Sequence, residues 1–270
     1  MTATTQSSTL DLHADNITIK FGGLVAVDDV SFTIPHGSVV SLIGPNGAGK
    51  TTYFNVLTGL YHPTSGRVYL GDEDVTGLSP HLVAHKGLAR TFQNIRLFNL
   101  MTAEENVMVA MHSHMKSGII DTVLKTPRQR REEREARERA HELLTFVDIG
   151  GVGDEYARNL SYGDQRRLEV ARALALRPKV LLLDEPTAGM NPQESARFVE
   201  FVHHIRDEMD VSVLLIEHDM SVVMKVSERI TVLDRGRKIA EGTPDEIKND
   251  QNVVEAYLGK TGTDGYRSDK

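Results

Sequence analysis

The sequence predicts an α/β fold, with a core of parallel strands, a smaller antiparallel sheet and an inserted helical region. Short apolar runs bounded by turn residues recur at VVSLIG (39–44), VLLLD (180–184), VSVLLIE (211–217) and RITVLD (229–234). Runs that are apolar throughout, without alternation, are typical of strands buried on both faces of a parallel sheet. Helical patterns separate these runs, and this alternation of elements indicates the α/β class.

The first of these strands leads through a glycine-rich loop into a helix. The segment KTTYFNVLTGL (50–60) places Phe54, Leu57 and Leu60 at helical spacing, so we expect all three on one face. The segments LDLHADNITIKFG (10–22) and GRVYLGDEDV (66–75) are interpreted as antiparallel strands and turns. Residues 95–175 are rich in helical patterns and lack buried-strand runs, which predicts a helical subdomain.

One helix of this region is rich in arginine. The segment TPRQRREEREARERAHELL (126–144) offers Thr126 as N-cap and Pro127 as the first helical residue. An apolar stripe at helical spacing follows, formed by Ala136, Ala140, Leu143, Leu144 and Val147. The arginines are compatible with RNA binding, but residues 128–142 hold six Arg against five Glu, with Glu133/Arg137 and Glu135/Arg139 four apart. A solvated face with ion pairs is therefore the favoured interpretation.

Composition excludes several classes of function. The 270 residues suit one large domain or two lobes. A net charge of -7 argues against a general nucleic-acid binder. The sequence has no cysteine, which excludes a disulfide framework and a thiolate metal site.

The ends of the chain are polar, and we expect loose tails at residues 1–10 and 260–270. The start, MTATTQSSTLDLHAD, lacks the basic and apolar regions of a signal peptide. The longest apolar runs, Val180–Leu183 and Val213–Ile216, fall far short of the ~18 residues that a membrane span needs. Any role at a membrane is thus expected to need partner chains.

The segment GPNGAGKT (44–51) matches the phosphate-loop pattern G-x-x-x-x-G-K-[ST] in its required place between a strand and a helix. Its glycines let the backbone approach phosphates closely, and the helix dipole faces the negative charge. We expect Lys50 to reach the β- and γ-phosphates, Thr51 to ligate Mg²⁺ and Thr52 to contact the α-phosphate. The loop alone indicates binding of a nucleoside triphosphate, which kinases, GTPases and motors share. The binding residues predicted here are Gly44, Asn46, Gly47, Ala48, Gly49, Lys50, Thr51 and Thr52.

Two carboxylates and a histidine follow buried strands. Asp184 ends VLLLD, where ligands of α/β proteins bind, and is expected to support Mg²⁺ through water or Thr51. Glu185 is expected to point the other way, as strand alternation requires, and to orient or deprotonate the water that attacks the γ-phosphate. The strand in LLIEHDM ends at His218, which is a candidate to hydrogen-bond the γ-phosphate. The alternatives are a strand end with two acids and a structural histidine.

These pieces occur in one order: phosphate loop, Gln93, LSYGD (160–164), VLLLDE and His218. The order resembles the ATP-binding subunits of ABC transporters, and the resemblance covers residues 11–259. It implies a RecA-like core (11–94 and 176–259) and a helical subdomain (95–175). It also implies a head-to-tail dimer with two ATP molecules between the chains, each meeting the phosphate loop of one chain and the signature of the other.

Further site residues come from this resemblance. Phe21 matches the aromatic residue that stacks on adenine. Gln93 matches the glutamine that contacts Mg²⁺ and the attacking water. Ser161 and Gly163 match the signature that binds the partner's ATP. Residues 188–191 match a loop that crosses the dimer interface, where Asn191 replaces the usual Asp.

Finer segments are similar to the ATP-binding subunits of high-affinity branched-chain amino acid importers. They are FGGLVAVDDVSF (21–32), GLARTFQNIRLF (87–98), LSYGDQRRLEVARAL (160–174), DEPTAGMNP (184–192), LLIEHDM (214–220) and EGTPDEI with VVEAYLG (241–247 and 253–259). The resemblance implies a second ATPase subunit or a second copy, two transmembrane permeases, a substrate-binding protein and a peripheral place on the cytoplasmic face of the inner membrane. Other cargo, lipopolysaccharide export above all, and a soluble ABC ATPase stay open as alternatives.

The signature LSYGD departs from the usual LSGGQ at its third and fifth positions. Ser161 precedes an amphipathic helix with Leu168, Ala171, Leu174 and Ala175 at helical spacing, and Asp164 three residues later gives a capping-box pattern. Asp164 in the first turn suits the helix dipole. Tyr162 gives up the freedom of glycine at positive φ. We therefore expect a working signature whose affinity is tuned by the charge of Asp164.

Overall fold

The computed structural model describes residues 10–111 and 127–258, and the side chains within these ranges except those of 127–130 and 258. The predicted N-cap Thr126, residues 1–9 of the predicted N-terminal tail and the predicted tail at 260–270 lie outside the described residues. The chain divides into two compact units. Unit 1 comprises Met1–Val83 and Thr187–Lys270, and unit 2 comprises Ala84–Pro186.

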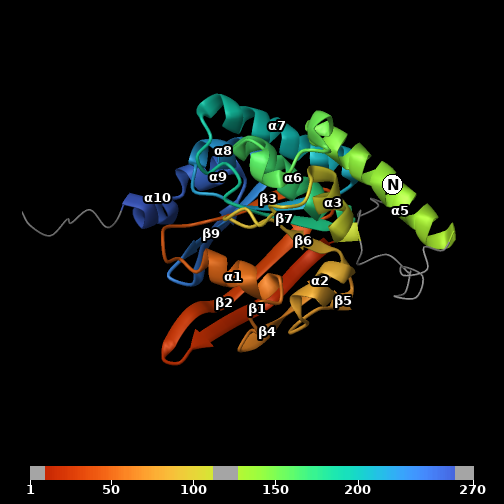
Figure 1. Cartoon of the computed structure of the whole chain (residues 1–270). Coiled ribbons are helices and arrows are strands. Elements are labelled where there is room, and N and C mark those ends of the chain that lie inside the picture. Colours follow the sequence, from red (N-terminus) through yellow and green to blue (C-terminus); the bar gives the residue numbers. More distant parts are fainter. Residues whose placement is uncertain (1–9, 112–126, 259–270) are drawn as a thin grey trace, which may run out of the picture. The chain divides into compact units, whose positions relative to one another are not determined.

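Unit 1 contains an antiparallel sheet with strand order β2-β1-β4-β5. Its strands are β1 (Leu10–Phe21), β2 (Leu24–Pro35), β4 (Ser65–Leu70) and β5 (Glu73–Asp74). The long hairpin of β1 and β2 is drawn in red in Figure 1. Alternating residues of β1 and β2 are buried, as expected when one face of a sheet packs against a core. The antiparallel strands predicted from the sequence are thus confirmed.

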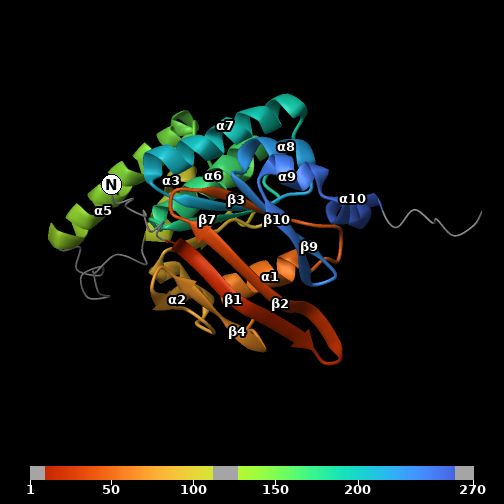
Figure 2. The ribbon, with the colours of Figure 1, turned by 180° about the vertical axis from the view of Figure 1, so that it is seen from behind.

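The parallel strands of unit 1 position the phosphate loop. Their order is β10-β9-β3-β8, with β3 (Val39–Ile43), β8 (Ser212–Ile216), β9 (Arg229–Asp234) and β10 (Arg237–Gly242). β3 runs parallel to both β8 and β9, and β10 returns antiparallel to β9, as Figure 2 shows from behind. Every residue of β3 and β8 is buried, which is why their sequences are apolar without alternation.

Two helices of unit 1 begin at clear capping signals. α7 (Pro192–Met209) and α9 (Pro244–Asn249) both start with a capping box and a proline, at Asn191 and Thr243 respectively. The others are α1 (Lys50–Leu57), α8 (Met220–Val226) and α10 (Gln251–Leu258), while α2 (Pro80–Lys86) crosses the boundary between the units. The prediction for Leu60 is wrong: α1 ends at Leu57, and Leu60 beyond it is 47% exposed.

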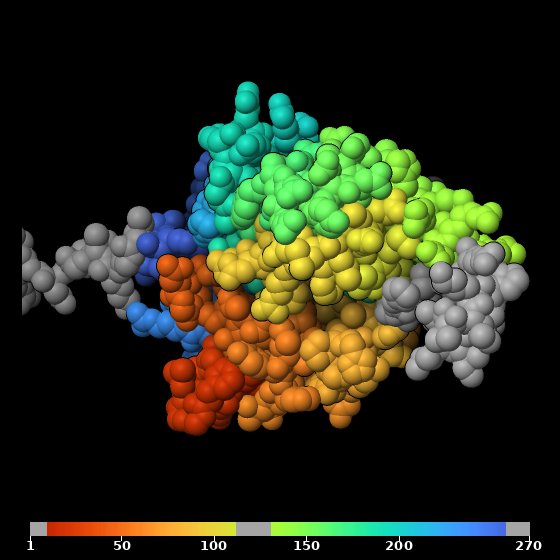
Figure 3. Space-filling model, viewed as in Figure 1, coloured from red at the N-terminus to blue at the C-terminus, as the bar shows by residue number. Residues whose placement is uncertain are grey.

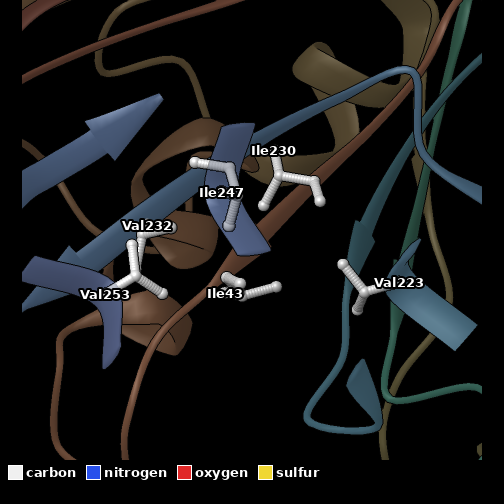
Figure 4. Packing of buried hydrophobic residues seen from close by; sticks show 6 residues of the cluster. All are labelled: Ile43, Val223, Ile230, Val232, Ile247 and Val253. Carbon is white, nitrogen blue, oxygen red and sulfur yellow. The ribbon is translucent and has the colours of Figure 1, made fainter. Parts of the chain in front are cut away.

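A cluster of aliphatic side chains fixes the end of β3 (Figure 4). Ile43, the last residue before the phosphate loop, packs with Ile230 and Val232 of β9. Val223 of α8, Ile247 of α9 and Val253 of α10 complete the cluster. Burying each such side chain is worth roughly 1.5–3 kcal/mol, so the C-terminal helices hold the strand from which the loop departs.

Unit 2 pairs two parallel strands, β6 (Leu88–Arg90) and β7 (Val180–Asp184), and contains a helical cluster. Its helices are α3 (Ala103–Met111), α5 (Pro127–Phe146), α6 (Tyr162–Ala175) and the short η2 (Gly150–Val152) and η3 (Ala157–Asn159). α3, α5 and α6 pack on one another. The predicted apolar stripes of α5 and α6 are buried. Among the residues described, none of the helices has the length and apolar character needed to cross a membrane.

The charges of α5 form ion pairs, but with partners other than those that spacing suggested. Glu135 pairs with Arg131 at 2.8 Å and Arg139 with Glu142 at 2.9 Å, both within the helix. Arg137 instead reaches Glu104 of α3 at 3.3 Å. One arginine of the predicted solvated face thus ties two packed helices together.

A histidine joins three segments of unit 1 at the start of β8. His36 Nδ1 lies 3.0 Å from Asp11 Oδ2, and its Nε2 lies 3.4 Å from Asp210 Oδ1. Ser212 donates its hydroxyl to the same Asp11 carboxylate at 2.6 Å. The hydrogen bond and the charge of Asp11 raise the pKa of His36 above its usual 6.5, with a smaller contribution from Asp210.

We predict that the stabilisation by His36 depends on pH. Because its pKa is raised on folding, its contribution is complete below the unfolded value and is lost as pH rises through the folded one. His36→Gln should lower the free energy of unfolding at about pH 6 by up to ~1 kcal/mol, the range for exposed ion pairs, and by less at about pH 8.5. Urea unfolding at both pH values tests this. An equal loss at both would contradict the prediction.

Candidate functional site

The phosphate loop leaves β3 through a residue that only glycine can fill. Gly44 has φ of 151°, and a Cβ there would overlap the backbone oxygen of Leu233. Gly49, with φ of 99°, precedes α1, and a Cβ on it would lie 2.7 Å from the backbone oxygen of Ala26. These close approaches bring the loop against neighbouring backbone and turn it into the helix within a few residues.

Lys50 folds back over the loop. Its Nζ donates to the carbonyl oxygens of Gly44 at 2.6 Å and Pro45 at 3.1 Å. This places an ammonium group beside the N-terminus of α1, where the helix dipole is positive. Thr51 is exposed and Thr52 is half-buried at the start of the same helix. Asn46 and Gly47 are exposed at the tip of the loop, while Ala48 is buried.

The C-terminal helix contacts the loop from within unit 1. The backbone N–H of Gly44 interacts with the hydroxyl of Tyr257 in α10 and holds its pKa down, although burial has the larger effect and raises it. Phe21 lies at the end of β1 and is 46% exposed. Its ring contacts that of Tyr61 edge to face, with ring centroids 5.3 Å apart. This end of the hairpin therefore presents an aromatic pair and not a single ring.

A buried carboxylate organises the histidine loop. Glu217 is fully buried and accepts hydrogen bonds from the backbone N–H of Thr187 at 2.9 Å, from the Thr187 hydroxyl and from the backbone N–H of His218 at 3.1 Å. His218 is exposed, with Nδ1 3.8 Å from Glu217 Oε2. Residue 217 was read in the sequence only as part of a strand. An acidic residue in an otherwise apolar run was the signal that could have identified it.

Asn191 has a local structural role as a helix cap. Its side-chain oxygen accepts the backbone N–H groups of Gln193 and Glu194 and caps α7. Asparagine and aspartate are equally good N-caps, so the replacement of the usual Asp keeps the helix start.

In unit 2, Asp184 is held by an arginine. Arg90 Nη2 donates to Asp184 Oδ2 at 2.7 Å, and both side chains are more than nine-tenths buried. Glu185 follows outside the strand with φ of 46°, a left-handed backbone that costs a non-glycine residue roughly 1–2 kcal/mol. Glu185 therefore lies beyond the end of β7, so strand alternation does not set the direction of its side chain.

Gln93 meets Glu185 directly. The side-chain Nε2 of Gln93 donates to Glu185 Oε2 at 2.9 Å. Two of the residues predicted to be catalytic, Gln93 and Glu185, thus lie within hydrogen-bond distance inside unit 2. Both side chains carry the hydrogen-bonding groups that hold an attacking water in phosphoryl transfer.

The signature begins α6 as a capped helix. Ser161 Oγ accepts the backbone N–H of Asp164 at 3.2 Å and donates to Asp164 Oδ2 at 2.7 Å. Tyr162 is the first helical residue, so its φ is the ordinary helical one and the freedom of glycine is not needed. Gly163 is exposed in the same turn. In Figure 3 the green surface from residues near 155 borders the yellow surface from residues near 100, where Thr102 and Tyr156 form a β-bridge.

The oxygen donors expected for Mg²⁺ are hard ligands, which Mg²⁺ prefers: the Thr51 hydroxyl, the Gln93 amide and the Asp184 carboxylate. Throughout residues 10–111 and 127–258, no group of three or more His, Cys, Asp and Glu side chains is placed to hold a metal. Unit 1 thus carries Phe21, the phosphate loop and His218, and unit 2 carries Gln93, Asp184, Glu185, Ser161 and Gly163.

Comparison with known proteins decides the family. A family model described as ABC transporter matches residues 27–188, which is more than half of the chain. The chain belongs to the ABC transporter family. It is an ATP-binding, ATP-hydrolysing cassette, and the α/β fold class predicted from its sequence is confirmed. A second model, described as branched-chain amino acid ATP-binding cassette transporter, matches residues 237–262 of the cassette.

Curated relatives match almost end to end. The cassette is 48% identical to the high-affinity branched-chain amino acid transport ATP-binding protein BraF of Pseudomonas aeruginosa, over 92% of this chain and 98% of BraF. It is 46% identical to the corresponding protein LivG of Escherichia coli, with the same coverage. It is 34% identical to the lipopolysaccharide export system ATP-binding protein LptB of Haemophilus influenzae, over 92% of this chain and 97% of LptB.

Solved structures share the architecture. An ATP-binding cassette of an ABC transporter in its ADP conformation has a TM-score of 0.80 at 32% identity, covering 93% of this chain and 99% of that one. A cassette described as a dimeric post-hydrolysis state bound to ADP and Pi has a TM-score of 0.72 at 27% identity, covering 86% of this chain and 98% of that one.

We predict that Glu217 is needed for the stability of unit 1. Glu217→Leu leaves the Thr187 and His218 donors buried without acceptors, which should lower the free energy of unfolding by about 3 kcal/mol. Glu217→Gln keeps one acceptor oxygen and should cost less than half as much. Urea unfolding of the purified chain measures both. Equal losses would show that size or charge, and not acceptance of these hydrogen bonds, is what matters.

Proposed function

We propose that this cassette supplies the energy for uptake of branched-chain amino acids or closely related ones. The main support for this cargo is the match of residues 237–262 to the branched-chain amino acid transporter model. The 46–48% identity to BraF and LivG supports it as well. Identity to LptB is lower at 34%, so lipopolysaccharide export is the second candidate.

In the proposed reaction, backbone N–H groups of the phosphate loop and Lys50 hold the phosphates of ATP. Thr51 and Asp184, the latter through water, with Gln93, would hold Mg²⁺; when bound, the ion neutralises charge on the phosphate oxygens. Thr52 contacts the α-phosphate, and Phe21 with Tyr61 offers an aromatic surface to the adenine.

Glu185 orients the attacking water, and Gln93 fixes Glu185 through the 2.9 Å hydrogen bond described above. His218 donates to the γ-phosphate. These roles for chain groups are positioning and electrostatic stabilisation, which carry most of the catalysis in phosphoryl transfer. Ser161 and the N-terminus of α6 bind the γ-phosphate of an ATP held by a second subunit.

The cassette is proposed to act in a dimer, with a second ATPase subunit or another copy, beneath two transmembrane permeases on the cytoplasmic face of the inner membrane. A separate substrate-binding protein delivers the cargo. ATP binding closes the dimer and hydrolysis reopens it. The proposed domain organisation is a RecA-like core at residues 11–94 and 176–259, which contains the phosphate loop, and a helical subdomain at 95–175, which contains the signature.

We predict that Glu185→Gln retains ATP binding but lowers the hydrolysis rate by about 10²–10⁴-fold, the range for loss of a group that assists proton transfer. The tagged variant, trapped with Mg²⁺ and ATP in native membranes, should co-purify with two amino acid permeases and a second ATPase. Recovery of lipopolysaccharide-export membrane proteins would transfer the cargo to the second candidate. Unchanged turnover would remove Glu185 from the reaction.

We make a separate prediction for the signature residues Ser161 and Asp164. Ser161→Ala should lower the ATPase rate of the assembled transporter about tenfold, because one hydrogen bond to a charged group is lost. Asp164→Gln removes a negative charge and a competitor for the Ser161 proton, so it should tighten apparent ATP affinity. Steady-state ATPase assays measure both variants. A Ser161→Ala rate equal to wild type would show that the capped helix has no role toward phosphate.

A further inference from the structure

Three side chains on one face of α6 reach the backbone of the segment that carries Gln93. Arg166, Glu169 and Arg172 are spaced three apart, so they project from one side of the helix. Arg166 Nη1 donates to the carbonyl of Phe92 at 2.7 Å, and its Nη2 to the carbonyl of Gln93 at 2.6 Å. Glu169 Oε1 accepts the backbone N–H of Phe92 at 3.2 Å.

The same face continues along the segment. Arg172 donates to the carbonyl of Arg96, and its guanidinium lies 5.0 Å from the ring centroid of Phe98. Phe92 is contacted by the guanidinium groups of Arg90 and Arg96, at 5.2 and 4.4 Å from its ring centroid. The side chains of α6 therefore contact residues 92, 93 and 96 through main-chain atoms. These contacts do not depend on the side chains of those three residues.

Arg166 and Glu169 also pair with each other. Arg166 Nη1 lies 3.2 Å from Glu169 Oε2, and each side chain is 6% exposed. Burying an ion pair seldom adds net stability, because the desolvation of both charges offsets their attraction. Each charge here is matched to a main-chain group of the Phe92–Gln93 segment. The effect of the Arg166–Glu169 pair is therefore to fix the conformation of that segment.

We propose that Arg166 and Glu169 are positioning residues that fix the backbone of Phe92 and Gln93, so that the Gln93 amide reaches Glu185. The inference rests on the function proposed above, because it acts through the Gln93–Glu185 pair. It also accounts for Tyr162 in the signature. The Tyr162 ring lies 5.6 Å from the Arg166 guanidinium, which a glycine at that position does not contact.

A matched pair of variants separates this role from helix stability. In the assembled transporter, Arg166→Met should lower kcat for ATP hydrolysis about tenfold or more with KM for ATP within about twofold, since small displacements of catalytic groups cost up to ~100-fold. Arg166→Lys keeps the charge but not the two-nitrogen fork, and should rescue only part of the rate. The control is Arg167→Met, on the same helix, which loses donations to the Val147 and Asp148 carbonyls and should stay within about twofold of wild type.

The deciding measurement is a double-mutant cycle with Gln93→Ala. If Arg166 acts by positioning Gln93, Arg166→Met should lower kcat by less than about twofold once Gln93 is alanine. A tenfold loss in both backgrounds would overturn the proposal. Should Arg166→Met fail to fold, the combined Arg166→Met and Glu169→Met variant removes both charges of the buried pair and serves in the same cycle.

Failure of the inference and failure of the proposed function give different results. If Gln93→Ala and Glu185→Gln both hydrolyse ATP at the wild-type rate, the proposed catalytic pair is wrong. The positioning role of Arg166 and Glu169 is then refuted as well. If both variants are impaired but Arg166→Met is additive with Gln93→Ala, the catalytic pair stands and only the positioning role is refuted. Urea unfolding of each variant shows that rates are compared between folded proteins.

Discussion

The close approach of the Gly44 backbone to the Leu233 carbonyl is the constraint on which the phosphate loop depends. Ile43, one residue earlier, is locked in a core supplied by β9 and by the C-terminal helices. The chain therefore leaves β3 at a fixed point and with a fixed direction. Any side chain at Gly44 would push the loop away from β9, and the backbone N–H groups would no longer converge.

Around this constraint, both units bury charged side chains whose hydrogen bonds go mainly to main-chain groups or to an oppositely charged partner. Glu217 holds Thr187 and His218 in unit 1. In unit 2, Arg90 holds Asp184, and Arg166 holds the Gln93 segment. Such groups are costly to bury alone, so each tolerates few alternative arrangements. Gln93 and His218 are exposed, but a backbone group of each is bonded to one of these buried charges.

The sequence was sufficient for the strands and loops whose signal is local. Apolar runs located β3, β7, β8 and β9, and the phosphate-loop pattern located the start of α1. Leu60 was assigned to a helical face because periodicity cannot show that the helix ends at Leu57. Glu185 was assigned by alternation because a left-handed turn after a strand leaves no pattern at a non-glycine residue.

Contacts between distant segments were beyond local reasoning. The spacing of charges in α5 suggested pairs within the helix, but Arg137 pairs with Glu104 of α3, a partner that only tertiary packing provides. The sequence analysis assigned no role to Arg166, because only the fold brings it to a carbonyl 73 residues away. The placement of the predicted site residues in a common site for ATP remains a prediction.

The departures from the usual family sequence, at Tyr162 and Asp164 in the signature and at Asn191 before α7, have one physical explanation. At Tyr162, Asp164 and Asn191, the backbone task is kept: a helical first residue, a helix-dipole partner and an N-cap. What changes is the side chain's further contact, to Arg166 in the case of Tyr162 and to the Ser161 hydroxyl in the case of Asp164. Since helix starts are preserved at all three, the substitutions alter charge and coupling near the proposed phosphate site without altering its scaffold.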